Sequence, residues 1–241
     1  MSSKVVLVTG STSGIGLATA QRFARNGDVV IFNSVQSVDE GKRLAEETKG
    51  SHYLQGDVAL AEDCERLIHG VVERCGQLDI LVNNAGKTTV IPHKDLDAAT
   101  VDVWREIFEV NVFGTWQLSV AAMPALRQSR GAIVNVSSAA GVRAIGSSIP
   151  YAASKAALNH MTMLLAKVVG PEVRVNAVAP GLIDTPWTQD WDVVRSAVQK
   201  MAPLRRSGEP DDVAEIIVAL ATSQYVTGQV VAVDGGLTLA I

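Results

Sequence analysis

The sequence predicts an α/β fold built on one doubly wound, seven-stranded parallel sheet with helices on both faces. Three observations predict it. Short runs of β-branched residues alternate along the 241-residue chain with longer helical patterns. Hydrophobic residues make up 47% of the chain but aromatic ones only 5%, and such aliphatic strands are typical of a parallel sheet that is buried on both sides. The 20 glycines suit tight turns between strands and helices.

Four strands and four helices are predicted in the first half of the chain. The run KVVLVT predicts the opening strand, and the helix after it ends where Gly27 follows. The run DVVIFN predicts a second strand, which leads into a charged helix. The expected strands cover residues 4–9, 28–33, 51–56 and 78–82, and the expected helices cover residues 14–26, 38–49, 61–75 and roughly 100–127.

The second half of the chain adds three strands and three helices. The runs AIVNVS, VRVNAV and QVVAV predict the strands, and an alanine-rich segment predicts the first of the helices. Because each strand–helix–strand unit takes a right-handed crossover, the helices must cover both faces of the sheet. The expected strands cover residues 132–137, 173–178 and 229–233, and the expected helices cover residues 151–169, 192–201 and 211–221.

No linker rich in proline, glycine and serine divides the chain, so residues 1–241 are expected to form a single domain. The least regular stretch, residues 181–210, contains two tryptophans and three prolines. A long irregular loop inside a compact domain is more often functional than idle. We therefore expect this stretch to be a substrate loop or lid.

Composition argues against several classes of protein. The net charge of −4 argues against a general nucleic-acid binder. The chain has no apolar run of the ~18 residues that a membrane span needs, and its N-terminus reaches glycine too early for a signal peptide. Cys64 and Cys75 cannot form a disulfide framework, and the four histidines lack metal-ligand spacing. We expect a soluble cytoplasmic protein without a metal, nucleic-acid or membrane partner.

A glycine-rich loop, TGSTSGIG at residues 9–16, joins the first strand to the first helix. Glycines there permit a tight turn and a close approach of the backbone to a pyrophosphate, and the helix N-terminus offers free N–H groups to the phosphates. The G-x3-G-x-G spacing differs from the usual G-x-G-x-x-G, and an ordinary turn is the alternative. The position of the loop in a βα series favours phosphate binding by Gly10, Ser11, Thr12, Ser13, Gly14, Ile15 and Gly16.

Tyr151 and Lys155 lie four residues apart on a predicted helix, so their side chains share a face. A free tyrosine titrates near pH 10, and a nearby lysine cation favours the phenolate and lowers that pKa. A Y-x3-K pair by itself occurs by chance on many helix surfaces. Ser138 strengthens the functional interpretation, because it ends the fifth strand thirteen residues before Tyr151, and ligands bind at the carboxyl ends of parallel strands.

These motifs resemble those of the classical short-chain dehydrogenase/reductase family, in particular its 3-oxoacyl-acyl-carrier-protein reductase-like members. The glycine-rich loop is similar to the family's T-G-x3-G-x-G signature, and residues 83–86 to its N-N-A-G element. Pro180 and Gly181, with Thr185 beyond them, resemble its P-G-x3-T segment. The resemblance covers nearly the whole chain and implies a Rossmann fold.

The resemblance implies an NAD(P)(H)-dependent oxidoreductase that transfers hydride between a nicotinamide and a carbonyl or secondary alcohol. Tyr151 would be the acid or base, and Ser138, rather than Ser137, would bind the substrate oxygen. Lys155 would hold the nicotinamide ribose and, with the positive nicotinamide ring, lower the pKa of the tyrosine. Asn111 would hold a water that links Lys155 to solvent. The implied catalytic tetrad is Asn111, Ser138, Tyr151 and Lys155.

Further cofactor contacts are implied after the third, fourth and sixth strands. In the family the acidic residue after the third strand holds the adenine amino group, and the P-G-x3-T segment contacts the nicotinamide amide. Tyr151 and Lys155 would also face the cofactor. The other residues at matching positions are Asp57, Val58, Asn84, Ala85, Gly86, Pro180, Gly181, Ile183 and Thr185.

The end of the second strand predicts the choice of cofactor. An acidic residue there binds the adenosine 2′-hydroxyl and repels a 2′-phosphate, but no acid occurs before Asp39. Asn33, Ser34 and Ser37 could donate hydrogen bonds to a phosphate. No arginine lies in this segment, and Ser13 stands where many NADP-using relatives have a basic residue. NADP(H) is therefore favoured, with NAD(H) as the alternative.

The loops after the fourth, fifth and sixth strands should line a mainly apolar substrate pocket. Trp187 and Trp191, four residues apart, could form a packed helix face or a lid, and Arg143 could steer an anion or simply be solvated. The fold does not choose between 3-oxoacyl, steroid and polyol substrates. The expected lining residues are Val90, Ile91, Pro92, Arg143, Ile145, Ser147, Trp187 and Trp191.

Two further expectations concern function and assembly. A catalytically silent protein that senses NADP is the alternative to an enzyme, although such proteins typically lose the tyrosine or the lysine. The small-residue stripe in residues 152–166 suggests close packing against another helix. The family's members often form tetramers through such helices, so a homotetramer is expected.

Overall fold

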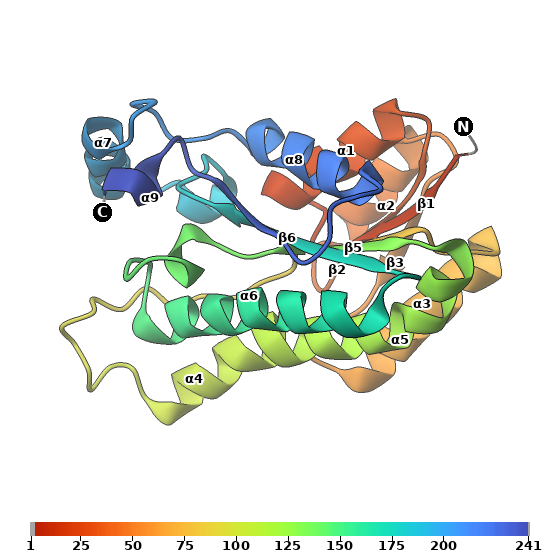
Figure 1. The fold of residues 1–241 in the computed structure, drawn as a ribbon, viewed down its shortest axis with the longest axis horizontal. Helices are drawn as coiled ribbons and strands as arrows, with labels where there is room; N and C mark the ends of the chain where they lie inside the picture. Colours follow the sequence, from red (N-terminus) through yellow and green to blue (C-terminus); the bar gives the residue numbers. More distant parts are fainter. Residues whose placement is uncertain (1–2, 241) are drawn as a thin grey trace.

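A seven-stranded sheet runs through the middle of the molecule (Figure 1). The computed structural model describes residues 3–240. The strand order is β3-β2-β1-β4-β5-β6-β7, and every neighbouring pair is parallel. The strands are β1 (Val5–Val8), β2 (Val29–Ser34), β3 (His52–Gln55), β4 (Ile80–Asn83), β5 (Ala132–Val136), β6 (Arg174–Pro180) and β7 (Val230–Val233). The predicted fold class and all seven predicted strands are confirmed.

Helices cover both faces of the sheet because its side chains alternate between two hydrophobic cores. Val6 and Val8 of β1 point into one core, which helices α1 (Gly14–Arg25), α2 (Val38–Glu47) and α8 (Pro210–Thr222) close. Val5 and Leu7 of the same strand point into the other core. Helices α3 (Ala61–Cys75), α5 (Thr115–Ser129) and α6 (Ile149–Val169) close that side.

The single helix predicted over residues 100–127 is three consecutive segments. Helix α4 (Val101–Phe108) runs into a π-helical turn, η1 (Glu109–Gly114), and then into α5. A π-turn widens the helix by one residue and is frequently found at functional sites. Hydrophobic periodicity cannot reveal it, because the turn keeps the chain helical. The turn contains Asn111, so the helix is irregular where the sequence predicts a catalytic residue.

A small group of elements lies apart from both large cores, at the upper left of Figure 1. Helices α7 (Asp192–Met201) and α9 (Leu237–Ala240) pack together through a separate cluster that contains Leu182, Val198 and Leu237. Two 3-10 turns, η2 (Ala139–Gly141) and η3 (Pro186–Thr188), follow β5 and β6. The sequence predicted α7 but neither α9 nor the two turns.

The order of the strands reverses between β1 and β4, which places a crevice at their carboxyl ends. From β1 the chain proceeds to β2 and β3 on one side, and from β4 to β5, β6 and β7 on the other. The segments that follow β1, β4, β5 and β6 therefore meet at this edge. In residues 3–240 no helix is both long and apolar enough to cross a membrane.

Candidate active site

A cleft of about 1370 Å³ opens at the carboxyl ends of the strands. It extends from the loop after β1 and the end of β2 to the elements around α7. The cleft exceeds the ~300–1,000 Å³ typical of a small-molecule pocket, so it has space for two ligands side by side. Its two halves differ in character, because the first is lined by glycines and small polar residues and the second mainly by apolar side chains.

The glycine-rich loop has the geometry of a phosphate cradle. Gly10 and Gly14 have φ angles of +59° and +55°, which side-chain-bearing residues rarely adopt. A β-carbon at Gly16 would collide with the carbonyl oxygen of Gly10 and the amide of Asn84. Ser13 at the N-cap of α1 makes no side-chain capping bond, so the first N–H groups of the helix have no side-chain acceptor from the cap. These features fit the phosphates of a dinucleotide.

Two of the predicted loop contacts lie behind the cleft rather than along it. The cleft is lined by Gly10, Thr12, Ser13, Gly14 and Ile15. Ser11 is fully buried, and its hydroxyl accepts a hydrogen bond of 2.9 Å from the backbone N–H of Asn33. Gly16 is buried against Gly10. Both residues shape the loop instead of facing a ligand.

Asn33 is likewise turned into the protein, contrary to its predicted role as a phosphate donor. Its Oδ1 accepts from the N–H of Gly10, and its Nδ2 donates to the carbonyl oxygens of Leu54 and Gly56, both at 3.1 Å. These bonds occupy both amide protons. Ser34 does line the cleft, and its hydroxyl lies 2.9 Å from that of Tyr53. Consecutive residues of β2 point to opposite sides, but the sequence does not tell which of the two sides faces the cleft.

The other predicted cofactor positions line the cleft together. They come from the segments after β3, β4 and β6: Asp57, Val58, Asn84, Ala85, Gly86, Pro180, Gly181, Ile183 and Thr185. The amide of Asn84 donates to the carbonyl oxygens of Thr9 and Gly10 at 2.8 and 3.0 Å, which ties the segment after β4 to the glycine-rich loop. One edge of the cleft is thereby held as a continuous surface.

Tyr151 and Lys155 meet at the junction of the two halves, on the first turns of α6. Lys155 Nζ donates to the carbonyl oxygen of Val136 at 2.9 Å and lies 5.7 Å from the centre of the Tyr151 ring. Burial lowers the pKa of Lys155 to about 8. Burial also raises the pKa of Tyr151, and a hydrogen bond with Ser138 lowers it in part.

The sequence predicted that Lys155 would lower the pKa of Tyr151. In the protein without a cofactor, burial raises that pKa instead. Desolvation disfavours the charged form of each group, and the sequence does not reveal how deeply a side chain is placed. A tyrosine that stays neutral is a proton donor, which suits the direction of carbonyl reduction.

The two serines at the end of β5 are separated by their surroundings. Ser137 is buried, and its hydroxyl donates to the carbonyl oxygen of Lys155 at 3.2 Å. Ser138 is less buried, and its hydroxyl acts on the pKa of Tyr151. Ser138, and not Ser137, is therefore the serine whose hydroxyl lies beside Tyr151, and its catalytic role stays a prediction.

Asn111 does not line the cleft but braces it from behind. Its Oδ1 accepts from the N–H of Lys87 at 2.8 Å, and its Nδ2 donates to the carbonyl oxygen of Lys87 at 2.9 Å. The same Nδ2 donates to the hydroxyl of Ser154, which stands next to Lys155 on α6. Asn111 thus connects the π-turn, the segment after β4 and helix α6.

The apolar half of the cleft contains most of the predicted substrate residues. Val90, Ile91, Pro92, Ile145, Ser147, Trp187 and Trp191 line it. Arg143 does not, because its guanidinium donates to the carbonyl oxygens of Thr238 and Val142. The two tryptophans do not share a helix face: Trp187 lies in η3, and Trp191 precedes α7 and packs on the cluster around Val198.

Sequence reasoning missed one side of this apolar half. Helix α7 turns a row of side chains into the cleft, and Leu237 of α9 joins it. Helical spacing of apolar residues in α7 is the signal that could have found the row. The residues concerned are Val193, Val194, Ala197, Val198, Met201 and Leu237.

The fold and the cleft define a short-chain dehydrogenase/reductase. Residues 10–238 match the family model described as "Enoyl-(Acyl carrier protein) reductase". The chain belongs to the short-chain dehydrogenase/reductase family and is an NAD(P)-dependent oxidoreductase. Within residues 3–240 no group of three or more histidine, cysteine or acidic side chains could hold a metal ion.

Individual relatives match over nearly their whole length. The chain is 54% identical over 239 residues to "Granaticin polyketide synthase putative ketoacyl reductase 2" of Streptomyces violaceoruber, covering 98% of this chain and 96% of the relative. It is 38% identical over 251 residues to the 3-oxoacyl-[acyl-carrier-protein] reductase FabG of Thermotoga maritima, covering 99% of each. A crystal structure titled as a putative short-chain dehydrogenase/reductase from Burkholderia xenovorans superposes with a TM-score of 0.92 at 37% identity, covering 99% of each chain.

Proposed function

We propose that the protein reduces the carbonyl group of an apolar acyl substrate, with Tyr151 as the proton donor and NADP(H) as the preferred cofactor. One observation supports this above all others. A neutral Tyr151, with Lys155 and Ser138 beside it, lies where the glycine-lined half of the cleft meets the apolar half. A group bound in either half can reach this junction.

The residues of the cleft have separable roles in the proposed reaction. The glycine-rich loop, Asp57, residues 84–86 and residues 180–185 would hold the dinucleotide, which supplies the hydride when bound. Ser138 donates a hydrogen bond to the substrate oxygen and stabilises the charge that develops on it. Tyr151 gives its hydroxyl proton to that oxygen. Lys155, which is charged below a pH of about 8, stabilises the tyrosinate that remains after Tyr151 has given up its proton.

Asn111 acts in this scheme as a positioning residue. Its side chain connects the backbone of Lys87 to Ser154, so the catalytic helix and the segment after β4 keep a fixed separation. A precise separation matters because misplacement of a reacting group by about 1 Å can cost a large part of the rate. Asn111 would also hold a water that connects Lys155 to solvent, as the family resemblance implies.

The preference for NADP(H) is supported by the end of β2. The cleft residues there, Ser34, Val35, Gln36 and Ser37, carry no carboxylate that would repel a 2′-phosphate. With Asn33 turned inward, Gln36, Ser37 and the exposed Ser13 are left as donors toward that phosphate. NAD(H) is the alternative, because no arginine lines this end of the cleft.

The acyl nature of the substrate is supported by the second half of the cleft. Residues 181–210 form the proposed substrate loop, and this loop contributes Val194, Val198 and Met201 to the lining. A steroid or polyol is the competing class. Polar side chains such as His93, Ser147 and Asp190 also line the cleft, but apolar side chains from α7 and the neighbouring loops predominate there. The names of the two relatives above, a ketoacyl and a 3-oxoacyl reductase, point to the same class.

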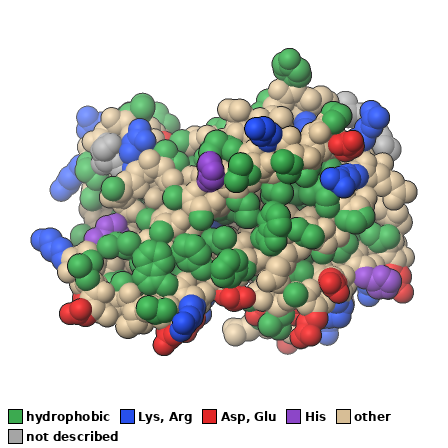
Figure 2. Space-filling view, turned by 60° about the horizontal axis from the view of Figure 1, so that its bottom comes forward, with side chains coloured by type: hydrophobic (Ala, Val, Ile, Leu, Met, Phe, Trp, Pro, Cys, Tyr) green, Lys and Arg blue, Asp and Glu red, His purple; other side chains and the backbone are tan. Residues whose placement is uncertain are grey.

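The assembly we propose is a homotetramer formed through the helices on one side of the sheet. Figure 2, turned toward the side of the molecule that carries α4, α5 and α6, shows hydrophobic side chains gathered on the surface. Large exposed apolar surfaces are typical of interaction sites. The side chains with helical spacing on η1, α5 and α6 are Phe113, Trp116, Val120, Met163, Leu164 and Val168. Sedimentation should give four copies, and a monomer at micromolar concentration would contradict the assembly.

We also infer that the protein works in the cytoplasm. Cys64 and Cys75 are both free thiols, as expected in a reducing compartment. Burial raises the pKa of the Cys64 thiol to about 11, which keeps it protonated and unreactive. Cell fractionation that recovers the protein with an oxidising compartment would contradict this inference.

A substrate panel with both reduced cofactors tests the proposed function. Purified protein is mixed with NADPH or NADH and with 3-oxoacyl thioesters, steroids, simple ketones or, in the reverse direction, polyols, and the absorbance of the reduced nicotinamide is followed. We expect turnover of the 3-oxoacyl thioesters and a lower KM for NADPH. Turnover of polyols alone would replace the substrate class, and cofactor binding without any turnover would favour the silent sensing protein.

A further inference from the structure

The indole of Trp187 and the side chain of Lys155 both lie beside Gly86 in the cleft. A β-carbon at Gly86 would lie 3.6 Å from Lys155 Nζ, 3.4 Å from Asn111 Oδ1 and 3.8 Å from Cη2 of Trp187. Three separate elements therefore converge on one point beside Gly86: the π-turn, α6 and the turn η3. Of these groups only the indole comes from the substrate loop.

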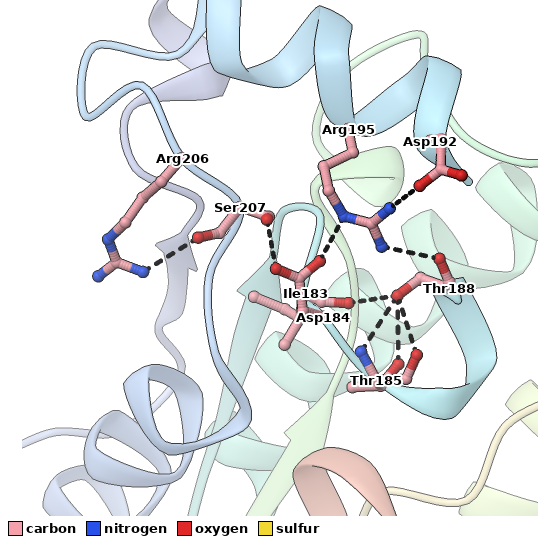
Figure 3. A network of polar contacts seen from close by, with 8 residues as sticks. All are labelled: Ile183, Asp184, Thr185, Thr188, Asp192, Arg195, Arg206 and Ser207. Atoms are coloured by element: carbon pink, nitrogen blue, oxygen red, sulfur yellow. Dashed lines mark hydrogen bonds and ion pairs between the residues drawn. The ribbon is translucent and has the colours of Figure 1, made fainter. Parts of the chain in front are cut away.

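The backbone on either side of Trp187 is held in place. Figure 3 shows the network: the hydroxyl of Thr188 donates to the carbonyl oxygen of Ile183 at 2.6 Å, and Asp184 pairs with Arg195 at 2.8 Å. On the other side, a β-carbon at Gly14 would lie 3.2 Å from Cγ2 of Thr185. The turn thus extends from Gly14 in the glycine-rich loop to Gly86 in the segment after β4.

The indole itself is not held. Its side chain is 47% exposed, and it forms none of the side-chain hydrogen bonds found in residues 3–240. A side chain that is fixed at its backbone but free at its ring can change rotamer without unfolding the turn.

The distance between the indole and Gly86 leaves no space for a second group. Carbon atoms in contact lie roughly 3.5–4.0 Å apart. A β-carbon added at Gly86 would already lie 3.8 Å from Cη2 of Trp187, so a single carbon atom would fill the space between the indole and the glycine backbone. A sugar or ring placed between them would need about twice that separation. A ligand that approaches Lys155 past Gly86 must therefore move the indole.

We propose that Trp187 is a gate residue whose indole shares the nicotinamide end of the cleft with the cofactor, so that its displacement is part of cofactor binding. The inference rests on the proposed function, which places the nicotinamide beside Lys155. The adenosine half would bind near Ser37, at the end of the cleft after β2, whereas Trp187 follows β6, four strands away in the sheet. Trp187 consequently weakens the binding of the whole dinucleotide but not that of its adenosine half.

Binding measurements on Trp187→Ala test the gate. Calorimetry gives Kd for NADP⁺ and for adenosine 2′,5′-bisphosphate, which lacks the nicotinamide half. Met201→Ala is the matched control, because Met201 lines the same cleft and is 46% exposed. We expect Trp187→Ala to bind NADP⁺ at least about threefold more tightly, since the closed state no longer competes. The Kd of the bisphosphate should be the same for the wild type, Trp187→Ala and Met201→Ala.

Trp187→Phe gives a second readout that does not depend on the alanine variant folding well. Acrylamide should quench the wild-type tryptophan fluorescence more strongly once NADP⁺ is bound, and this increase should be absent from Trp187→Phe. An unchanged or weaker Kd for NADP⁺ in Trp187→Ala would overturn the gate, as would an equal change for both ligands. If the wild type bound neither NADP⁺ nor NAD⁺, the proposed function itself would fail, and the gate with it.

Discussion

The wall of the cleft that carries Tyr151 and the loop that faces it are built differently. The wall, formed by the end of β5 and the first turns of α6, is held by buried hydrogen bonds such as those of Lys155 with Val136 and of Asn111 with Ser154. The start of the loop, residues 181–210, is held by the buried hydrogen bond from Thr188 to Ile183. The rest is held by a partly exposed ion pair between Asp184 and Arg195 and by a small hydrophobic cluster outside both main cores.

This difference indicates which part of the molecule can change at little cost. Loss of one partner in a buried polar network leaves the other unsatisfied, which costs about 1–3 kcal/mol. Loss of a partly exposed ion pair costs far less. Under the proposed function, the wall would therefore fix the chemistry, whereas the loop could adapt to different substrates.

Replacement of Tyr151 by phenylalanine should have the largest effect, because it removes the proposed proton donor and leaves the ring in place. We expect kcat for carbonyl reduction to fall by roughly 10²–10⁴-fold, the usual contribution of a general acid. Steady-state kinetics give kcat, and fluorescence titration gives the Kd of NADPH, which should change little. Near-normal turnover in this variant would show that another group donates the proton.

Ser138→Ala should cause the second-largest loss of kcat. It removes one hydrogen bond to the developing oxyanion, a contribution of about 10²-fold in kcat. Ser137→Ala is the matched control, because the Ser137 hydroxyl donates to the carbonyl oxygen of Lys155 inside the wall. The effect of Ser137→Ala should appear mainly in the melting temperature. A larger loss of kcat in Ser137→Ala than in Ser138→Ala would reverse the assignment of the two serines.

The pH profile should show the charge of Lys155. Its pKa is lowered to about 8, so its positive charge is lost as the pH rises through that value. If reduction needs the charged lysine, kcat/KM should fall about tenfold per pH unit above the pKa. The same shift makes the unfolded chain bind more protons between pH values of about 8 and 10.5, so this group adds stability there as the pH rises.

Deprotonation of Lys155 therefore does not destabilise the fold between pH values of about 8 and 10.5, so a loss of activity in that range cannot come from unfolding caused by this group. Ser138→Ala is a useful control, because it should keep the same alkaline limb at a lower overall rate. A kcat/KM that stays flat up to the usual lysine pKa of about 10.4 would argue against a required charge on Lys155.

Arg195→Gln should have the smallest effect of the series. It removes the ion pair with Asp184 while keeping a polar side chain at the surface of the loop. We expect a rise of a few-fold in KM for a long acyl substrate, an unchanged kcat and little change in melting temperature. A large loss of kcat would mean that the loop takes part in the chemistry, and the contrast with the wall would then fail.

The fold could be predicted from the sequence because each strand carries its own signal. Buried runs such as VVLV in β1 and AIVNV in β5 are continuous and aliphatic, and the glycines and helix caps between them mark the turns. The π-turn around Asn111 was not predictable, since it preserves helical periodicity. The short helix α9 was missed because four residues give no periodic pattern.

The site could be predicted where spacing along one element determines position, and not where orientation does. Tyr151 and Lys155 meet because they share a helix face. Asn33 faces inward although its neighbour Ser34 lines the cleft, and only the hydrogen bonds to Gly10 and Leu54 reveal it. The place of Trp187 depends on how the loop folds back over β6, which no local pattern specifies.

The dependence of kcat/KM on acyl chain length tests most directly whether the wall provides the chemistry and the loop the selectivity. The measurement uses a series of 3-oxoacyl thioesters with wild type, Ser138→Ala and Val194→Gln, whose side chain lines the apolar half from α7. We predict that Ser138→Ala lowers kcat/KM by one factor at every length, whereas Val194→Gln lowers it most for the longest chains. A uniform loss in Val194→Gln, or a length-dependent loss in Ser138→Ala, would contradict this division of roles.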